Sequence, residues 1–189
     1  MKSKYSFSNE NKITVTLVDS YYVWLGFLGA SNVCALHKAS VFNPNQSYWE
    51  VDITADEIKF MQQDSTYLYL AIDDSTNSGA KVTKSNPSTI TYFTKQAGIT
   101  EASVDLCLDA TYVYFLTPGV ASGINSKIVK YNKSTRAYVE TIDLTTVNNA
   151  KKIDIDTDGS LWITSETDPV KLTKAIYSGS WSFTTYTLS

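Results

Sequence analysis

Residues 109–116 read DATYVYFL, and this stretch belongs to a degenerate repeat that occurs four times along the chain. The second aromatic residue of each copy marks the period, with steps of 45, 45 and 48 residues between Trp24, Tyr69, Tyr114 and Trp162. A lysine that follows each copy gives a second series, with steps of 46, 46 and 44 residues between Lys38, Lys84, Lys130 and Lys174. Two series with nearly the same step indicate four repeats of one structural unit.

Each unit is predicted to contain four short strands. A β-type run that ends on an acidic residue comes first, in residues 13–19, 58–64, 104–109 and 153–158. The aromatic strand follows, then a strand that carries the lysine, and then an alternating strand in residues 48–53, 89–94, 138–144 and 181–188. Turn-forming residues separate the last two strands, in residues 43–45, 86–88, 132–134 and 178–180. Sustained helical periodicity is missing, so we expect an all-β fold.

Four strands in about 46 residues, repeated four times, are typical of a β-propeller with four-stranded antiparallel blades. We therefore predict a single four-bladed domain over residues 12–189, with blades at about 12–55, 56–101, 102–149 and 150–189. Residues 1–11 are predicted to form a polar extension or one extra strand, because Tyr5 and Phe7 alternate with polar residues.

The aromatic strand, with KIVKYNKSTRAYVETIDL (residues 127–144) and KIDIDTDGSLWIT (residues 152–164), resembles the repeats of NHL and YVTN propellers. The resemblance covers residues 12–188. It implies that first strands line a central channel, and that the loops after the second and fourth strands share one face. Most members have six or seven blades, and a blade shared between the two ends often closes the ring. In this chain the first unit begins with a first strand and the last unit ends with a fourth strand, so no blade is shared between the two ends.

Two modes of ring closure follow from a whole number of units. The first blade could pack on the fourth within one chain, with residues 1–11 as an added strand, and this monomer is the expectation. Alternatively, two chains could form a homodimer in which each supplies half of an eight-bladed ring.

Composition excludes several partners and gives little information about location. The net charge of the 189-residue chain is −3 and its lysines are scattered, so we expect neither nucleic acid nor a membrane as a partner. Residues 1–12 lack an apolar segment, which predicts no signal peptide. No run approaches the roughly 18 apolar residues of a membrane span. A cytoplasmic or virion-associated protein is the expectation.

Residues for catalysis or for a cofactor are scarce. His37 is the only histidine, the two cysteines are Cys34 and Cys107, and there is no nucleophile elbow, zinc spacing or Gly-rich phosphate loop. We expect no enzyme activity and no cofactor. His37 is interpreted as a strand residue, and the cysteines as small buried hydrophobic side chains that stay reduced.

The sequence DIDTDG (residues 154–159) resembles the start of a calcium loop, in which carboxylates alternate and a glycine makes the turn. Its ligands would be Asp154, Asp156 and Asp158. The twelfth position of such a loop is Ser165 instead of glutamate. A hairpin with an Asp-Gly turn is therefore the preferred interpretation, and calcium is the weaker one.

Carboxylates on the first strands leave a second functional class open. Asp105, Asp154 and Asp156 would face the central channel, where a lyase or hydrolase could use them. We expect them to be solvated channel residues instead. The alternating tyrosines and tryptophans of the second strands are interpreted as core packing, because they recur at strand spacing in every unit.

The loops are the predicted binding surface. Residues 73–79 and 118–126 form the longest ones, with 96–101 and 145–149 beside them. The candidate binding residues in and next to these loops are Asp73, Asp74, Asn77, Asn125, Asn148, Asn149 and Glu166. Such polar loops favour a protein or glycan partner over an apolar small molecule. The predicted function is a non-enzymatic interaction or structural module, in a virus particle or another large assembly, with carbohydrate binding as the alternative.

Overall fold

The computed structural model describes residues 12–28, 33–42, 49–120, 124–145, 147–166 and 170–188. The strands of these residues are β1 (Ile13–Val18), β2 (Tyr22–Phe27), β3 (Val33–Ser40), β4 (Trp49–Thr54), β5 (Glu57–Gln63), β6 (Tyr67–Asp73), β7 (Asn77–Thr83), β8 (Asn86–Thr94), β9 (Asp105–Leu108), β10 (Tyr112–Thr117), β11 (Lys127–Asn132), β12 (Tyr138–Asp143), β13 (Ala150–Ile155), β14 (Leu161–Ser165), β15 (Lys171–Tyr177) and β16 (Trp181–Thr187). The predicted extra strand with Tyr5 and Phe7 lies outside the described residues.

Every sheet contains four strands that are consecutive in the sequence and antiparallel to their neighbours. The first sheet is β1–β4, the second β5–β8, the third β9–β12 and the fourth β13–β16. The prediction of an all-β fold with four propeller blades is thereby confirmed. The described part of the chain contains no helix that could span a bilayer.

The sheets follow one another in chain order, and each has a forward face toward the next sheet and a backward face toward the preceding one. On β6, Leu68 and Leu70 share a hydrophobic cluster with Trp24 of the first sheet, so they lie on the backward face. Tyr69, between them, shares a cluster with Phe115 of the third sheet and lies on the forward face. The period of two in the sequence thus gives both faces of a blade an apolar surface.

Three hydrophobic clusters hold the four sheets together, one at each junction between consecutive sheets. The second aromatic residue of the first three units is buried in them: Trp24 is 0% exposed, Tyr69 1% and Tyr114 5%. The prediction that these aromatics pack the core is correct for them. Trp162 of the fourth unit is only half-buried, because it lies on a forward face that no following sheet covers.

The acidic residue at the end of each first strand shapes the hairpin that follows. One oxygen of Asp19 accepts the backbone N–H groups of Tyr21 and Tyr22, at 2.8 and 2.7 Å. Asp64 and Asp109 make the same pair of bonds in their hairpins. The carboxylate thus replaces backbone partners that a tight turn cannot supply.

The structure corrects the lysine series in the second unit. The residue opposite the second aromatic is Lys38 in the first unit and Lys81 in the second, whereas Lys84 lies in the turn after β7. Lys38 Nζ donates a hydrogen bond of 2.8 Å to the backbone carbonyl of Lys84. Lys81 donates in the same way to Lys133, also over 2.8 Å. These two strand lysines therefore contact the turn of the following sheet, whereas Lys130 of the third sheet donates to Glu140 of its own sheet.

A second correction concerns residues 86–88, which were predicted to form a turn. Asn86 and Pro87 belong to β8, and the turn is made by Lys84 and Ser85. Proline is tolerated there because β8 is the last strand of its sheet, where one side needs no ladder hydrogen bond.

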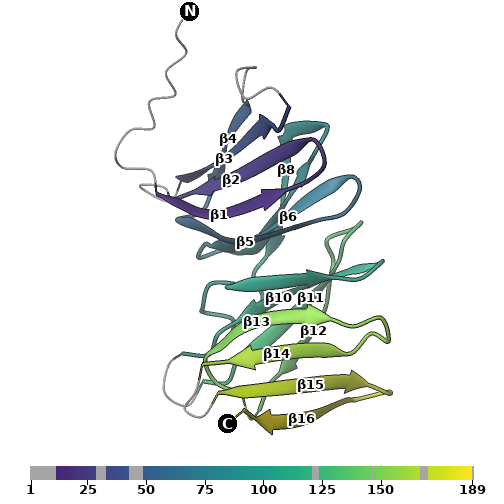
Figure 1. Cartoon of the computed structure of the whole chain (residues 1–189). Coiled ribbons are helices and arrows are strands. Elements are labelled where there is room, and N and C mark those ends of the chain that lie inside the picture. The colour runs from purple at the N-terminus through teal and green to yellow at the C-terminus, as the bar shows by residue number, and fades with distance from the viewer. Residues whose placement is uncertain are drawn as a thin grey trace, which may run out of the picture.

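The four sheets form an open arc. Figure 1 shows β1–β4 at one end of the molecule and β13–β16 at the other. The extensive contacts between sheets join only consecutive ones, through β1 and β5, β5 and β9, and β9 and β13. The expected packing of the first blade on the fourth within one chain is therefore not observed among the described residues. The physical reason is the angle set by the three junctions, which separates the two ends.

Candidate functional site

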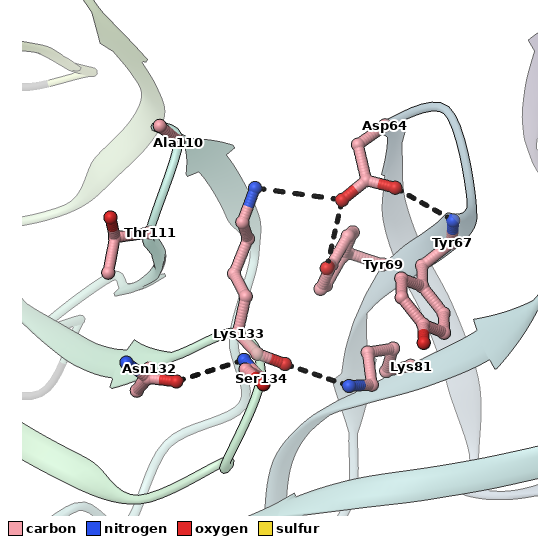
Figure 2. A pocket seen from close by; sticks show the side chains of 9 residues that line it. All are labelled: Asp64, Tyr67, Tyr69, Lys81, Ala110, Thr111, Asn132, Lys133 and Ser134. Carbon is pink, nitrogen blue, oxygen red and sulfur yellow. Dashed lines mark hydrogen bonds and ion pairs between the residues drawn. The ribbon is translucent and has the colours of Figure 1, made fainter.

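A groove crosses the junction between the second and third sheets, with a volume of about 350 Å³. We call it the 2–3 groove, and Figure 2 shows the residues that line it: Asp64, Tyr67, Tyr69, Lys81, Ala110, Thr111, Asn132, Lys133 and Ser134. Its two walls come from different units, since the first four residues belong to the second unit and the others to the third. The groove therefore exists only because the two sheets pack together.

Asp64 organises one wall of the 2–3 groove. Besides its two backbone bonds, it accepts a hydrogen bond of 3.1 Å from the Tyr69 hydroxyl, and its Oδ2 lies 3.6 Å from Lys133 Nζ (Figure 2). Burial alone would raise the pKa of Asp64, but the hydrogen bonds from Tyr67, Thr66 and Tyr69 and the charge of Lys133 lower it. The carboxylate is thus held in its charged form, and its oxygens are already occupied.

Two ammonium groups make the 2–3 groove locally positive. Lys81 Nζ lies 4.5 Å from the centre of the Tyr67 ring, while one of its protons goes to the carbonyl of Lys133. Burial and the nearby charge of Arg136 lower the pKa of Lys81. Because an ammonium has three donors, Lys81 keeps donors for a ligand after bonding to Lys133.

A related groove crosses the junction between the third and fourth sheets, with a volume of about 250 Å³. This 3–4 groove is lined by Tyr114, Lys130, Asp158, Gly159, Ser160, Ile176, Tyr177 and Trp181. Tyr114 and Lys130 are a cross-strand pair, as Tyr69 and Lys81 are in the unit before. The opposite wall is aromatic, since the rings of Tyr177 and Trp181 lie 5.3 Å apart. The two grooves thus share a tyrosine–lysine pair on one wall and differ in the residues of the opposite wall.

The concave side of the arc holds a third cavity, of about 400 Å³. Its lining residues are Phe60, Gln62, Asp105, Leu106, Lys152, Ile153, Asp154, Trp162 and Thr164. Asp105 was expected to be solvated, yet it is only 1% exposed. The reason is the packing of β13 on β9, in which the Ile153 N–H donates to Asp105 Oδ2 at 2.9 Å. Asp154 and Asp156 are exposed, as predicted.

The surroundings of Asp105 are unfavourable for a charge. Burial raises its pKa to about 6, against the hydrogen bond from Ile153 and the charge of Lys152. Its Oδ1 lies 3.9 Å from Lys152 Nζ and has no hydrogen-bond partner among the described residues. Lys152 also lies over the ring of Phe60, with 4.6 Å between Nζ and the ring centre.

The candidate binding residues of the second unit stabilise their own hairpin. Residues 73–79 were predicted to form a long loop, but Asp73 ends β6 and Asn77 begins β7. Asp74 accepts the backbone N–H groups of Thr76 and Asn77, which closes a short turn. Asp73 pairs with Lys59 at 3.3 Å.

The other candidate binding residues lie in the third and fourth units. Asn149 adopts a left-handed backbone conformation (φ 53°), and its carbonyl accepts the Glu166 N–H at 3.2 Å. Glu166 pairs with Lys151 at 3.4 Å, Asn148 is exposed and Asn125 is half-buried. The structure brings Asn149 and Glu166 together, whereas Asp73, Asp74 and Asn77 lie in a hairpin of the second unit. Their role in binding stays a prediction.

The weak calcium candidate is a hairpin turn. One oxygen of Asp154 accepts the N–H of Ile155, Asp156 accepts that of Thr157 and Asp158 accepts that of Ser160. Gly159 has a φ of 82° at the turn. In the described part of the chain, no three His, Cys, Asp or Glu side chains converge as metal ligands would.

The remaining reactive side chains lie inside the first and third sheets. His37 is 7% exposed, with Nε2 3.3 Å from a Glu50 oxygen, and burial lowers its pKa. Cys34 and Cys107 are buried free thiols, and burial raises the pKa of Cys34 to about 12.

Sequence reasoning missed both grooves. Tyr67, Lys81 and Lys133 carry the 2–3 groove, yet the lysine series pointed to Lys84. A search for charged residues that recur one blade apart on opposite sides of a junction would have paired Asp19 with Lys84 and Asp64 with Lys133.

Comparison with known proteins gives a likeness of fold. No protein family matches this sequence, and no curated protein matches it. One similar solved structure is "YCF48 bound to D1 peptide", at 12% sequence identity and a TM-score of 0.49. The match covers 92% of this chain and 70% of that one.

Proposed function

We propose that this protein is a non-enzymatic protein-interaction module that binds an extended segment of a partner along consecutive blade junctions. The observation that carries the proposal is the pair of grooves, 2–3 and 3–4, which stand one blade apart and share a tyrosine–lysine pair. An enzyme needs one site with converging groups, whereas a row of related grooves suits a chain that passes over several blades.

The chemistry of the grooves defines the partner segment. Lys81 and Lys133 offer ammonium donors against the single carboxylate of Asp64, so the 2–3 groove suits an acidic side chain or backbone carbonyls. Tyr177 and Trp181 offer aromatic surface, so the 3–4 groove suits an apolar or aromatic side chain. We therefore expect the bound segment to combine an acidic residue with an apolar or aromatic one.

The resemblance to NHL and YVTN repeats, and the setting of a virus particle or other large assembly, are compatible with this proposal. In such an assembly, a neighbouring protein would supply the extended segment that binds along the two grooves. The polar loops with Asn125, Asn148, Asn149 and Glu166 would add contacts to a protein or glycan that reaches beyond the grooves.

A lyase or hydrolase is the second candidate function, and Asp105 is its one supporting observation. Its raised pKa and the cavity beside it fit a general acid. However, one of its oxygens is bonded to the Ile153 N–H, and the side chain is almost fully buried. A structural role accounts for both facts.

The test is selection of binders from a random peptide library, followed by fluorescence anisotropy of the selected peptides. We expect sequences that combine Asp or Glu with an aromatic residue. Lys81→Ala and Tyr177→Ala should each weaken their binding about tenfold or more. Lys151→Ala is the matched control, since Lys151 is half-buried like Lys81 and lies outside both grooves.

Two results would contradict the proposal. One is a set of selected peptides whose affinity is the same for Lys81→Ala, Tyr177→Ala and Lys151→Ala. The other is binding to an array of immobilised glycans with no binding to peptides, which would favour the carbohydrate-binding alternative.

A further inference from the structure

The first two internal junctions, between the first and second sheets and between the second and third, share one pattern of contacts. A strand lysine on the forward face donates to a carbonyl in the turn of the next sheet, as Lys38 does to Lys84 and Lys81 to Lys133. The lysine in that turn returns the contact, with Lys84 3.5 Å from Asp19 and Lys133 3.6 Å from Asp64. Sheets therefore recognise each other by a forward face and by the turn between the third and fourth strands.

The forward face of the fourth sheet carries the same groups, uncovered. Lys174 lies opposite Trp162, as Lys38 lies opposite Trp24, and the two lysines are 5.1 and 5.0 Å from the respective ring centres. Tyr186 stacks on Trp162 with 6.4 Å between the rings and remains 46% exposed. Such a face on an end repeat is expected to be polar if it stays in water. This one carries the aromatic pair Trp162 and Tyr186 among polar residues such as Asp154, Thr164 and Lys174.

The backward face of the first sheet is the complementary surface. Val23 and Leu25 stand where Leu68 and Leu70 stand in the second sheet. Beside them Val18 is 59% exposed, whereas Phe27 and His37 on the same face are buried. In the turn after β3, Val41 and Phe42 are 44% and 76% exposed. Figure 1 places this sheet far from the fourth sheet of the same chain.

The two ends also differ from these two junctions in a matched way. Val41 stands three residues after Lys38 and Tyr177 three residues after Lys174, whereas the second and third units have Lys84 and Lys133 at this position. The carboxylate that such a lysine would meet, Asp158, is already 3.6 Å from Lys174 of its own sheet. The first sheet therefore lacks the turn lysine, and in the fourth sheet Lys174 already contacts the carboxylate that this lysine would meet.

We propose that the forward face of the fourth sheet binds the backward face of the first sheet of a second copy of this chain. The turn with Val41 and Phe42 packs near Trp162 and Tyr186. From strand spacing and rise, one sheet face covers about 400 Å². Two such junctions in a dimer bury about 800 Å² per chain, which is the size of a stable interface. A single junction repeated without closure would give a filament.

The first measurement is the mass of the wild-type chain by light scattering at several concentrations. We expect an assembly of two or more 21.0 kDa chains. Trp162→Asp on one face and Val18→Asp on the other should each give monomers, because every junction then contains one altered face. Val139→Asp is the matched control, since Val139 is 41% exposed on an outer strand of the third sheet.

Mixing the two variants makes the test specific. A Trp162→Asp chain keeps a normal first sheet and a Val18→Asp chain keeps a normal fourth sheet, so an equimolar mixture can form one unaltered junction. One junction buries half the area of two, so we expect dimers in the mixture at a higher protein concentration than the wild type needs, and monomers in each separate sample. Circular dichroism and thermal unfolding confirm that the separate variants are folded.

Three results would overturn the inference: a wild-type monomer at all concentrations, an assembly that Trp162→Asp and Val18→Asp leave intact, or folded variants that stay monomeric when mixed. If the wild-type chain is a monomer that associates only after deletion of residues 1–11, then residues 1–11 cover the backward face of the first sheet instead of a second chain. Peptide binding by the grooves involves other residues, so failure of either proposal leaves the other unaffected.

Discussion

Asp64 and Lys133 are 69 residues apart in the chain, yet their side chains meet at 3.6 Å across the junction of the second and third sheets. The same carboxylate closes its own hairpin through the N–H groups of Thr66 and Tyr67. One side chain therefore couples the local turn to the packing of two blades.

Replacing this carboxylate should destabilise the protein more than replacing a turn carboxylate alone. We expect Asp64→Ala to lower the free energy of unfolding by about 2 kcal/mol, through loss of the turn bonds and of the contacts to Tyr69 and Lys133. Asp74→Ala removes the same kind of turn bonds without a contact to another sheet, and should cost about 1 kcal/mol. Urea unfolding of both variants gives the comparison, and equal losses would contradict the coupling.

The pH dependence of Asp64 has a defined sign. Its folded-state pKa is lowered below the usual value of 3.8, so the stabilisation is present above that value. It is lost as the pH falls through the folded-state pKa. Urea midpoints measured below pH 4 should therefore converge for wild type and Asp64→Ala, and a constant difference down to strongly acidic pH would refute this.

Asp105 should show the opposite sign. Its folded-state pKa of about 6 lies above 3.8, so the folded state binds more protons between these values and loses stability as the pH rises through them. Asp105→Asn removes this penalty and should stabilise the protein at pH 7 by about 3 kcal/mol, with a flatter profile between pH 4 and 6. Asp154→Asn, on the exposed neighbour, should stay within about 0.5 kcal/mol of wild type. Destabilisation by Asp105→Asn at pH 7 would disprove this account.

The junction between the second and third sheets also depends on Gly79. A Cβ there would lie 2.2 Å from Phe115 Cε1 and 2.6 Å from the backbone oxygen of Leu70. We expect Gly79→Ala to cost about 3 kcal/mol by overpacking. Gly98→Ala meets no neighbouring atom and should cost about 1 kcal/mol, from its φ of 81° alone. Thermal unfolding of both variants measures the difference, and a Gly79→Ala protein as stable as wild type would rule out this close approach.

The two thiols should be unreactive in the folded protein. Cys34 and Cys107 are buried and burial raises the pKa of each, so little thiolate forms at pH 8. A thiol reagent should modify neither in native buffer and both after unfolding in denaturant. Failure to titrate them in the unfolded chain would mean that they are oxidised.

The sequence was sufficient for the fold because local patterns determine it. The acidic residue, the alternating aromatics and the turn formers each act within a few residues, so four antiparallel sheets were predictable. The assignment of Lys84 failed because Lys81 and Lys84 are only three residues apart, and the spacing alone does not determine which one lies in the strand. The prediction of a turn at Pro87 was wrong for a similar reason, since proline is excluded from central strands but tolerated in an edge strand.

The site was less predictable than the fold because it lies between units. Whether Asp105 is solvated depends on how closely β13 packs on β9, and the 2–3 groove depends on how Tyr67 and Lys133 are placed across a junction. Closure within one chain was preferred over the open half-ring that was kept as the alternative, since the angle between consecutive sheets arises from packing and has no signature in a repeat count.

Each sheet consists of consecutive strands, and this arrangement has a consequence for folding. The hydrogen-bonded strand pairs of the described residues are all neighbours in the sequence, so a blade can form before any other blade exists. The second and third sheets have partners on both faces, whereas the first and fourth have one. Cooperativity then spreads from the middle of the array outward, and β13–β16 can open while β5–β12 stay folded. In the isolated chain, the amide hydrogens of the end blades are accordingly expected to exchange with solvent first.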